Sequence, residues 1–352
     1  MSKHHNLFNF NTFRFPRTRY QGSKYKLKEW IKDSLSKIEF TTALDAFSGT
    51  ATISYIMKEM NKTIYSNDIL KFNHDIAKAL IENNNEQITK KEFEDIIKKK
   101  EDFTYSYFIR DTFQDIYFLD NENEWLDIVI QNIHQIKNEY KKSMFLWALY
   151  QSCISKRPYN LFHRKNLYVR TSDVKRNFGN KTTWDKPFEK HFYDFIQEIN
   201  HAIFDNEKNN KVFCSDIFNL NICVDLIYID TPYIPQKGSL THYRDFYHFL
   251  EGLSNYYNWE KDIDYTSKHK KLKSVYNIWE DKKEIKNGFE NLIKKFQNSI
   301  IVISYREDGI PSIDELVELL EKYNKKVSVE TMNYQYVFSK KQNLKEVLII
   351  GK

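Results

Sequence analysis

Cysteine is scarce in this chain, and what little there is shows no pattern of metal ligation. The 352 residues contain three cysteines, an odd number without the paired spacing of a zinc site. A GxGxxG run is also missing, which argues against a nicotinamide or flavin dinucleotide as the cofactor. These absences predict a protein of the reducing cytoplasm that has no structural zinc. The cysteines are Cys153, Cys214 and Cys223.

Long apolar runs are absent as well. No stretch approaches the roughly eighteen apolar residues of a membrane span, and the first residues, Met1 to His5, lead into no apolar signal core. Hydrophobic residues nevertheless make up 41% of the chain and aromatic residues 16%, enough to fill a sizeable core. The length exceeds that of one typical domain. We therefore expect a folded protein longer than one typical domain, with no membrane attachment.

The most informative segment is the tetrapeptide Asp230-Thr231-Pro232-Tyr233, which follows the apolar run 224–229. An exocyclic amine of a nucleic-acid base is a poor nucleophile, and two acceptors that bind both of its hydrogens favour a tetrahedral nitrogen. An ionised Asp230 and the Thr231 carbonyl are such acceptors. Pro232 restricts the turn, and the Tyr233 ring can stack on a base, a contact worth roughly 1–3 kcal/mol. The alternative is a strand that ends in an Asx-Pro turn with a packed tyrosine.

A second informative segment lies near the start of the chain. Residues 41–51 have the pattern of a short buried strand, a tight turn at Gly49 and a helix with apolar residues at helical spacing. The next predicted strand, residues 63–66, ends at Asn67-Asp68. Ligands of open parallel sheets bind beyond the carboxyl ends of such strands. An acid at that position is placed to accept hydrogen bonds from ribose hydroxyls.

Together with Arg19-Tyr20-Gln21-Gly22-Ser23-Lys24, these segments resemble the Dam-like DNA adenine-N6 methyltransferases. The motifs of that family run in the order R-Y/W-x-G-x-K, D-x-F-x-G-x-G, target-recognition region and D-P-P-Y, and this chain keeps the order. The resemblance implies an α/β fold, a Rossmann-like class I methyltransferase sheet with an inserted, mainly helical module. Residues 1–71 and 206–352 would form the catalytic domain, and residues 72–205 the module that recognises the target.

The resemblance also assigns roles to residues. The catalytic group would be Asp230, Thr231, Pro232 and Tyr233. Asp68 would hold the ribose of S-adenosyl-L-methionine, and Asp216 would lie near its adenine. The full set expected around the cofactor is Tyr20, Lys24, Asp45, Phe47, Gly49, Asp68, Asp216 and Asp230. Two positions depart from the family pattern, because Thr231 replaces its first proline and Ala51 replaces its second glycine; we expect both to be tolerated.

Positive charge is concentrated in one segment. The formal net charge is +6, and residues 155–185 contain eight lysines and arginines against two aspartates. Aromatic and asparagine side chains alternate with these charges, as in a surface that reads duplex DNA. A solvated loop is the alternative. The predicted DNA-binding residues are Lys156, Arg157, Arg164, Lys165, Arg170, Lys175 and Arg176. The insertion at 255–285 contains a smaller lysine cluster, which fits either a second DNA contact or a solvated helix face.

The C-terminal part alternates helices and strands. Strands are expected at 299–305, 327–336 and 347–350 and a helix at 313–323, and the last two strands suit the antiparallel hairpin of a methyltransferase sheet. Just after the tetrapeptide, three side chains fit either the wall of a base pocket or ordinary packing. They are Tyr243, Tyr247 and His248.

These observations predict a site-specific methyltransferase that flips an adenine out of duplex DNA and methylates its N6 without a covalent enzyme intermediate. Similar loops serve cytosine-N4 and RNA amine methyltransferases, although Asp at 230 favours adenine in the family comparison. A DNA-binding protein that retains a silent methyltransferase fold is the alternative from another class. The chain has no nuclease motif, so by family analogy a cognate restriction endonuclease would be a separate polypeptide. No metal is expected.

Overall fold

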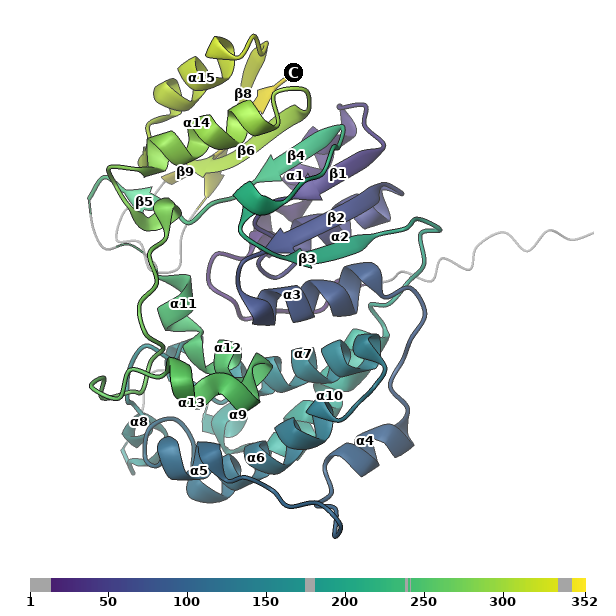
Figure 1. The fold of residues 1–352 in the computed structure, drawn as a ribbon, viewed down its shortest axis with the longest axis vertical. Coiled ribbons are helices and arrows are strands. Elements are labelled where there is room, and N and C mark those ends of the chain that lie inside the picture. The colour runs from purple at the N-terminus through teal and green to yellow at the C-terminus, as the bar shows by residue number, and fades with distance from the viewer. Residues whose placement is uncertain (1–13, 175–180, 238–239, 241, 335–343) are drawn as a thin grey trace, which may run out of the picture.

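The computed structural model describes residues 14–174, 181–237, 240, 242–334 and 344–352. The described chain forms two lobes, one built on a sheet and one built of helices (Figure 1). The sheet lobe contains both the N-terminal segment and the last strand. The candidate functional segments meet where the two lobes approach one another.

The main sheet has seven strands in the order β3-β2-β1-β4-β6-β9-β8. β9 runs antiparallel to both of its neighbours, whereas the other pairs are parallel. The strand order reverses between β1 and β4, which is the place where open sheets of this kind bind ligands. The bounds are β1 Thr42–Asp45, β2 Thr63–Asp68, β3 Lys211–Cys214, β4 Leu226–Ile229, β6 Ile300–Arg306, β8 Val327–Tyr334 and β9 Leu344–Gly351. The short strands β5 Ile234–Pro235 and β7 Gly309–Ile310 form a second sheet.

Helices cover both faces of the main sheet. One face packs on α14 Ile285–Lys295 and α15 Ile313–Lys322 through Ile227, Ile303 and Ile349. A capping box at Ser312 and Glu315 starts α15, because each side chain accepts from the backbone N–H of the other. The opposite face packs on the helices α1 Lys28–Ser36, α2 Thr52–Glu59 and α3 Lys71–Ala77. Burial on both faces explains why the central parallel strand β4 is apolar throughout.

The helical lobe is centred on α7, Glu139–Ser155, which is apolar on all sides and buried from Ser143 to its end. Helices of this kind occur only inside a core. α10, Phe188–Asn200, packs along α7. The other helices between residues 78 and 185 are η2 Lys78–Glu82, α4 Lys90–Ile96, α5 Phe108–Thr112, α6 Asp120–His134, η3 Pro158–Asn160, α8 Tyr168–Thr171 and α9 Lys181–Asp185.

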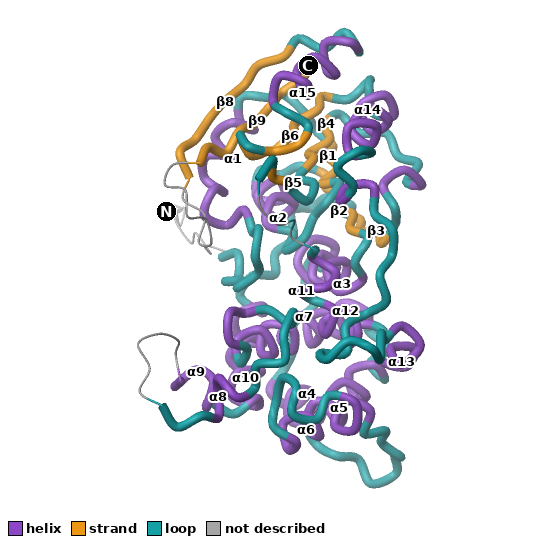
Figure 2. Tube along the Cα trace, turned by 90° about the vertical axis from the view of Figure 1, so that its left-hand side faces the viewer, coloured by secondary structure: helices purple, strands orange, loops and turns teal. Residues whose placement is uncertain are grey.

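The chain returns to the helical lobe after the tetrapeptide at residues 230–233. α11 Tyr243–Phe246, α12 His248–Ser254, η5 Tyr256–Asn258 and α13 Trp259–Asp262 lie beside the helical module in both views (Figures 1 and 2). Phe249 and Trp259 pack on Phe113 of that module. The division expected from the sequence did not include this crossing, because an apolar pattern does not show which lobe will bury it.

Most expected elements form within a residue or two of their predicted bounds, including the strands at 63, 299 and 327 and the helix at 313. The predicted Rossmann-like class I methyltransferase sheet is confirmed by its strand order and by the single reversed strand β9. Helix α14 was not predicted. Residues 335 and 336, expected as the end of a strand, lie outside the described residues.

Candidate active site

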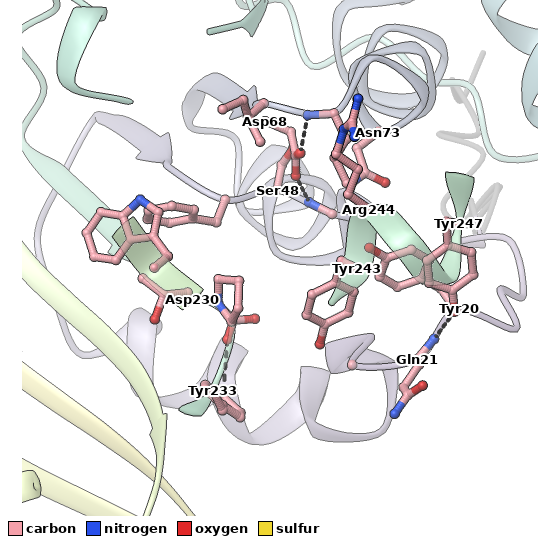
Figure 3. A pocket seen from close by; sticks show the side chains of 18 of the residues that line it. Tyr20, Gln21, Ser48, Asp68, Asn73, Asp230, Tyr233, Tyr243, Arg244 and Tyr247 are labelled. Atoms are coloured by element: carbon pink, nitrogen blue, oxygen red, sulfur yellow. Dashed lines mark hydrogen bonds between the residues drawn. The ribbon is translucent and has the colours of Figure 1, made fainter. Parts of the chain in front are cut away.

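A cavity of about 1440 Å³ opens at the carboxyl ends of β1, β2 and β4. Segments from both lobes line it, among them residues 18–27, the turn after β1 and the tetrapeptide after β4. The element η1, Lys24–Leu27, begins in the first of these segments. Figure 3 shows Asp230 and Tyr233 on one side of this cavity and the rings of Tyr20, Tyr243 and Tyr247 on the other.

The tetrapeptide and Lys24 form one hydrogen-bonded group. The Lys24 ammonium donates to Asp230 Oδ1 at 2.7 Å and to the Tyr233 hydroxyl at 2.8 Å. The Tyr233 hydroxyl in turn donates to Asp230 Oδ1 at 2.9 Å. Within the described part of the chain no residue donates to Asp230 Oδ2, so this oxygen is available to an incoming donor. The sequence-based assignment gave Tyr233 only a stacking ring, and the structure adds partners for its hydroxyl.

The charge of Lys24 is held in place by its neighbours. Burial on its own would lower the pKa of the Lys24 ammonium, but the nearby carboxylates of Asp230 and Glu346 and the hydrogen bond to Asp230 outweigh it and raise the pKa. Lys24 is therefore a permanent cation at neutral pH. Lys24, one of the predicted cofactor residues, thus lies against the Asp230 carboxylate.

The turn after β1 has the geometry of a ligand cradle. Gly49 has a positive φ of 50°, and a Cβ built there would meet only a ring atom of Tyr20, at 4.0 Å. Asp68 Oδ2 accepts from the Gly49 N–H at 2.9 Å, and Asp68 Oδ1 accepts from the Leu70 N–H at 2.9 Å. Ala51, which replaces the second glycine of the motif, has a positive φ of 58°. A non-glycine residue in this backbone conformation costs only about 1 kcal/mol of conformational free energy. The turn can therefore keep its shape with alanine at position 51.

Two further predicted acids contact the chain itself. Asp45 Oδ2 accepts from the Ser54 N–H at 3.0 Å and from its hydroxyl at 2.7 Å, and thereby anchors α2 to β1. Burial raises the pKa of the Asp45 carboxyl to about 7, although the Ser54 hydrogen bonds oppose the shift. Asp216 accepts from the Phe218 N–H at 3.0 Å and starts the turn η4, Ile217–Asn219. Both acids line the cavity.

Aromatic rings form two walls of the cavity. Phe47 meets Trp279 edge to face with ring centroids 5.0 Å apart, and Trp279 stacks on Phe218 at 5.8 Å. Trp279 lies in η6, Ile278–Glu280, at the end of the 255–285 insertion. On the other side Tyr20 stacks between Tyr247 at 4.3 Å and Tyr243 at 5.7 Å. Flat apolar walls beside a few polar groups are typical of sites that bind aromatic ligands.

Gly22 in the upstream motif is required by this second wall. A Cβ at Gly22 would lie 2.2 Å from the Tyr243 hydroxyl oxygen, and its φ is 83°. The Gln21 N–H donates to the Tyr247 hydroxyl at 2.7 Å. The backbone at Gln21 and Gly22 thus packs against Tyr243 and Tyr247. These tyrosines follow the tetrapeptide at 230–233 and lie more than 200 residues later in the chain.

Comparison with known proteins identifies the family. A family model described as D12 class N6 adenine-specific DNA methyltransferase matches residues 20–319. The chain belongs to this family. It is an adenine-specific DNA methyltransferase, as the ordered motifs predicted, and the arrangement above is its candidate active site.

The relatives of this adenine methyltransferase are modification enzymes. Type II methyltransferase M2.HphI of Haemophilus parahaemolyticus is 28% identical over 341 residues, covering 95% of this chain and 96% of the relative. Modification methylase StsI of Streptococcus sanguinis is 26% identical over 87% of this chain, which spans 46% of that protein. Type II methyltransferase M.FokI of Planomicrobium okeanokoites is 24% identical over 87% of this chain and 47% of its own length. A solved methyltransferase structure, precorrin-6y C5,15-methyltransferase from Geobacter metallireducens GS-15, aligns with a TM-score of 0.31 at 8% identity over 96% of this chain and 95% of its own.

The predicted DNA-binding residues of the methyltransferase divide into two groups. Lys156, Arg157 and Arg170 are buried. The Lys156 ammonium pairs with Glu122 at 2.8 Å, and Arg170 binds both oxygens of Glu122, at 2.8 and 2.9 Å. These three basic side chains bind groups inside the helical lobe, which argues against contact with DNA phosphates. Arg164 and Lys165 are exposed, whereas Lys175 and Arg176 lie outside the described residues.

Arg157 braces the loop that carries the exposed pair. Its guanidinium donates to the carbonyls of Leu161 at 3.2 Å and Arg164 at 3.1 Å and lies over the Tyr117 ring at 4.3 Å. Burial lowers the pKa of Arg157 to about 9, which still leaves it charged at neutral pH. The sequence showed the concentration of basic residues but not which of them face inward, because their partner Glu122 lies more than thirty residues away in the chain.

Trp279 and Glu346 are among the cavity residues that sequence reasoning missed. Trp279 lies in a polar, aromatic segment without a motif. Glu346 is 1% exposed on β9, between residues outside the described part and an apolar run. A single acid at the start of an apolar terminal strand was the signal that could have revealed it.

Proposed function

We propose that the chain transfers a methyl group from S-adenosyl-L-methionine to N6 of an adenine rotated out of duplex DNA into the cavity. The observation that carries this proposal is the Asp230 carboxylate at the carboxyl end of β4, oriented by Lys24 and Tyr233 and faced by aromatic rings. An amine needs such an acceptor, and a base needs such faces. No helix among the described residues is long and apolar enough to cross a membrane.

The residues present fit this cofactor. Asp68 and the glycine turn at Gly49 meet at the switch point of the sheet, where a ribose and its neighbouring groups bind in this fold class. Ser48 Oγ is buried there and has no hydrogen-bond partner among the described residues, so it awaits a ligand group. Burial raises the pKa values of Asp45 and Asp68. A cationic ligand beside them would offset that burial by favouring their charged forms.

The chain's own residues prepare the amine for attack. When bound, the cofactor supplies the methyl group on a positively charged sulfur. Asp230 Oδ2 and the Thr231 carbonyl accept the two amine hydrogens, which makes the nitrogen lone pair available and stabilises the positive charge that develops on it. The nitrogen forms its bond to carbon as the carbon–sulfur bond breaks, and one amine proton then leaves to solvent. No enzyme group becomes covalently attached.

Aromatic faces hold the flipped base. Tyr233 lies on the same side of the cavity as Asp230, and Tyr243 lies on the opposite side (Figure 3). The charges of Asp230 and Glu346 act on Tyr243 across this space; burial raises its pKa to about 12, so it remains a neutral ring at working pH. Stacking on such rings offsets part of the few kcal/mol needed to unstack a base.

Two substitutions at Tyr233 separate its ring from its hydroxyl. We expect Tyr233→Phe to lower kcat by roughly tenfold, because the hydroxyl's hydrogen bonds with the charged Lys24 and Asp230 are lost, at a net cost of about 1.5 kcal/mol. Tyr233→Ala removes the stacking face as well and should lower kcat/KM by at least a further tenfold. Steady-state methylation of a cognate duplex measures both. Equal loss in the two variants would show that the ring contributes nothing.

The exposed basic residues of the helical lobe are proposed to hold the DNA backbone. Arg164 and Lys165 follow the cavity-lining residues 159–161, and Tyr168 beside them is also exposed. On the other rim, residues 274–276 line the cavity, and Tyr276 is 71% exposed. The duplex would lie between these rims with its target base over Asp230. Of the 255–285 insertion, only this rim is therefore proposed as a DNA contact.

Salt dependence tests the first rim. Replacing Arg164 and Lys165 together by Gln should weaken DNA binding at low salt and reduce the slope of log K against log salt by about 2, since each lost phosphate contact contributes about 0.9. Lys190→Gln, an exposed charge of α10 that does not line the cavity, is the matched control. An unchanged slope in the double variant would place the backbone contacts elsewhere.

The direct test is transfer of labelled methyl from S-adenosyl-L-methionine to mixed-sequence duplex DNA, followed by digestion to nucleosides. Deoxy-N6-methyladenosine is the expected product. Labelled N4-methylcytosine, or transfer to RNA alone, would overturn the substrate assignment, and cofactor binding without transfer would indicate a silent DNA-binding protein. We also propose a cytoplasmic role in restriction–modification beside a separate cognate endonuclease, which co-purification from the source cells can test.

A further inference from the structure

Glu346 is a buried carboxylate at the edge of the sheet that carries the candidate active site. β9 runs antiparallel to β6, so its first residues lie where the parallel strands end. Glu346 pairs in register with Arg306 of β6 and with Met332 of β8. It is 1% exposed and lines the same cavity as Asp230. Burying a carboxylate is costly unless charged or polar groups compensate it, so its place in this cavity requires a reason.

The compensating groups belong to the catalytic constellation. Glu346 Oε2 lies 3.4 Å from the Tyr233 hydroxyl. Its charge also acts on the Lys24 ammonium, together with that of Asp230. Three charged side chains from three distant parts of the sequence therefore converge around one tyrosine hydroxyl. Glu346 therefore adds a second negative charge beside the Lys24 ammonium.

We infer that Glu346 is a positioning residue for methyl transfer, acting through Tyr233 and Lys24. The Tyr233 hydroxyl has one proton and two carboxylate acceptors, Asp230 at 2.9 Å and Glu346 at 3.4 Å. When a substrate amine engages Asp230, Glu346 can accept the hydrogen bond that the Tyr233 hydroxyl donates. The Tyr233 ring then stays in place. Its charge also balances Lys24, so that Asp230 keeps its full strength as an acceptor. This inference rests on the proposed function.

The test is the isosteric variant Glu346→Gln in the full chain. With saturating S-adenosyl-L-methionine and cognate duplex, its single-turnover methylation rate should fall by about 10- to 100-fold, because an interaction that acts on the developing charge is lost. KM for the cofactor and Kd for DNA should stay within about twofold. Lys345→Gln, the exposed neighbour on β9, should behave like the wild type. A wild-type rate in Glu346→Gln would overturn the inference.

Two readouts separate positioning from folding. Thermal unfolding of Glu346→Gln should occur within a few degrees of the wild type, since a neutral amide is less costly to bury than a carboxylate. In a double-mutant cycle, adding Glu346→Gln to Tyr233→Phe should cost less than the two single losses combined, because both act through the same hydroxyl. Additive losses, or a lower melting temperature that accounts for the activity, would contradict the inference. A wild-type enzyme inactive on every duplex would instead reject the proposed function.

Discussion

Asp230→Ala is expected to lower methyl transfer about 1,000-fold while the affinity for duplex DNA stays nearly unchanged. In the proposed mechanism the carboxylate is the acceptor that stabilises positive charge on the amine nitrogen, and loss of one such preorganised group typically costs 100- to 1,000-fold in kcat. It makes no contribution to the proposed backbone contacts, which lie on the rims of the cavity. Single-turnover transfer and a DNA-binding titration measure the two quantities separately.

The structure complicates this variant, because Asp230→Ala removes a partner of the buried Lys24. Asp230→Asn is therefore the matched control, since its amide retains the size and one acceptor oxygen. Because Glu346 remains near Lys24, we expect Asp230→Asn to be destabilised less than Asp230→Ala and still to lose at least 100-fold in rate. Strong loss of DNA binding with residual activity in either variant would remove Asp230 from the catalytic role.

Glu122→Gln is expected to destabilise the protein by about 3–5 kcal/mol. Glu122 is the counter-ion for two buried cations, Lys156 and Arg170, and breaking a buried pair leaves uncompensated charge. A cost of this size is a large part of the 5–15 kcal/mol that stabilises a typical domain. Urea denaturation measures it. Glu124→Gln on the same helix, whose bridge to Arg110 spans 3.9 Å at the surface, should cost at most about 1 kcal/mol.

The pH dependence of stability tests the same group. Burial on its own would raise the pKa of Glu122, but the hydrogen bonds from Arg170 and the charges of Arg170 and Lys156 outweigh it and hold the pKa below its ordinary value of 4.5. The stabilisation is therefore complete above the unfolded pKa and is lost as the pH falls through the folded value. The wild type and Glu122→Gln should converge in stability below pH 4.5. A constant difference down to low pH would contradict the assignment.

Local sequence contained enough information for the fold and the centre of the site. A strand buried on both faces, such as β4, has an apolar sequence, and a capping box such as that at Ser312 marks the first residue of a helix. Most elements of the sheet lobe were therefore predictable. The order of the three motifs identified the chemistry, because Asp230, Gly49 and Asp68 occupy positions at strand ends. Parallel strands bring such ends to one edge of a sheet, whatever lies between them in the chain.

Contacts between distant segments decided the rest. Whether Arg157 or Arg164 faces solvent depends on the helices that pack around the loop. The amino-acid composition does not show which of the two is buried. The crossing of residues 243–272 into the helical lobe, and the meeting of Glu346 with Lys24 and Tyr233, depend on which surfaces bury one another. These pairings join residues hundreds of positions apart, and their energies come from burial and charge compensation, which exist only once the chain has folded.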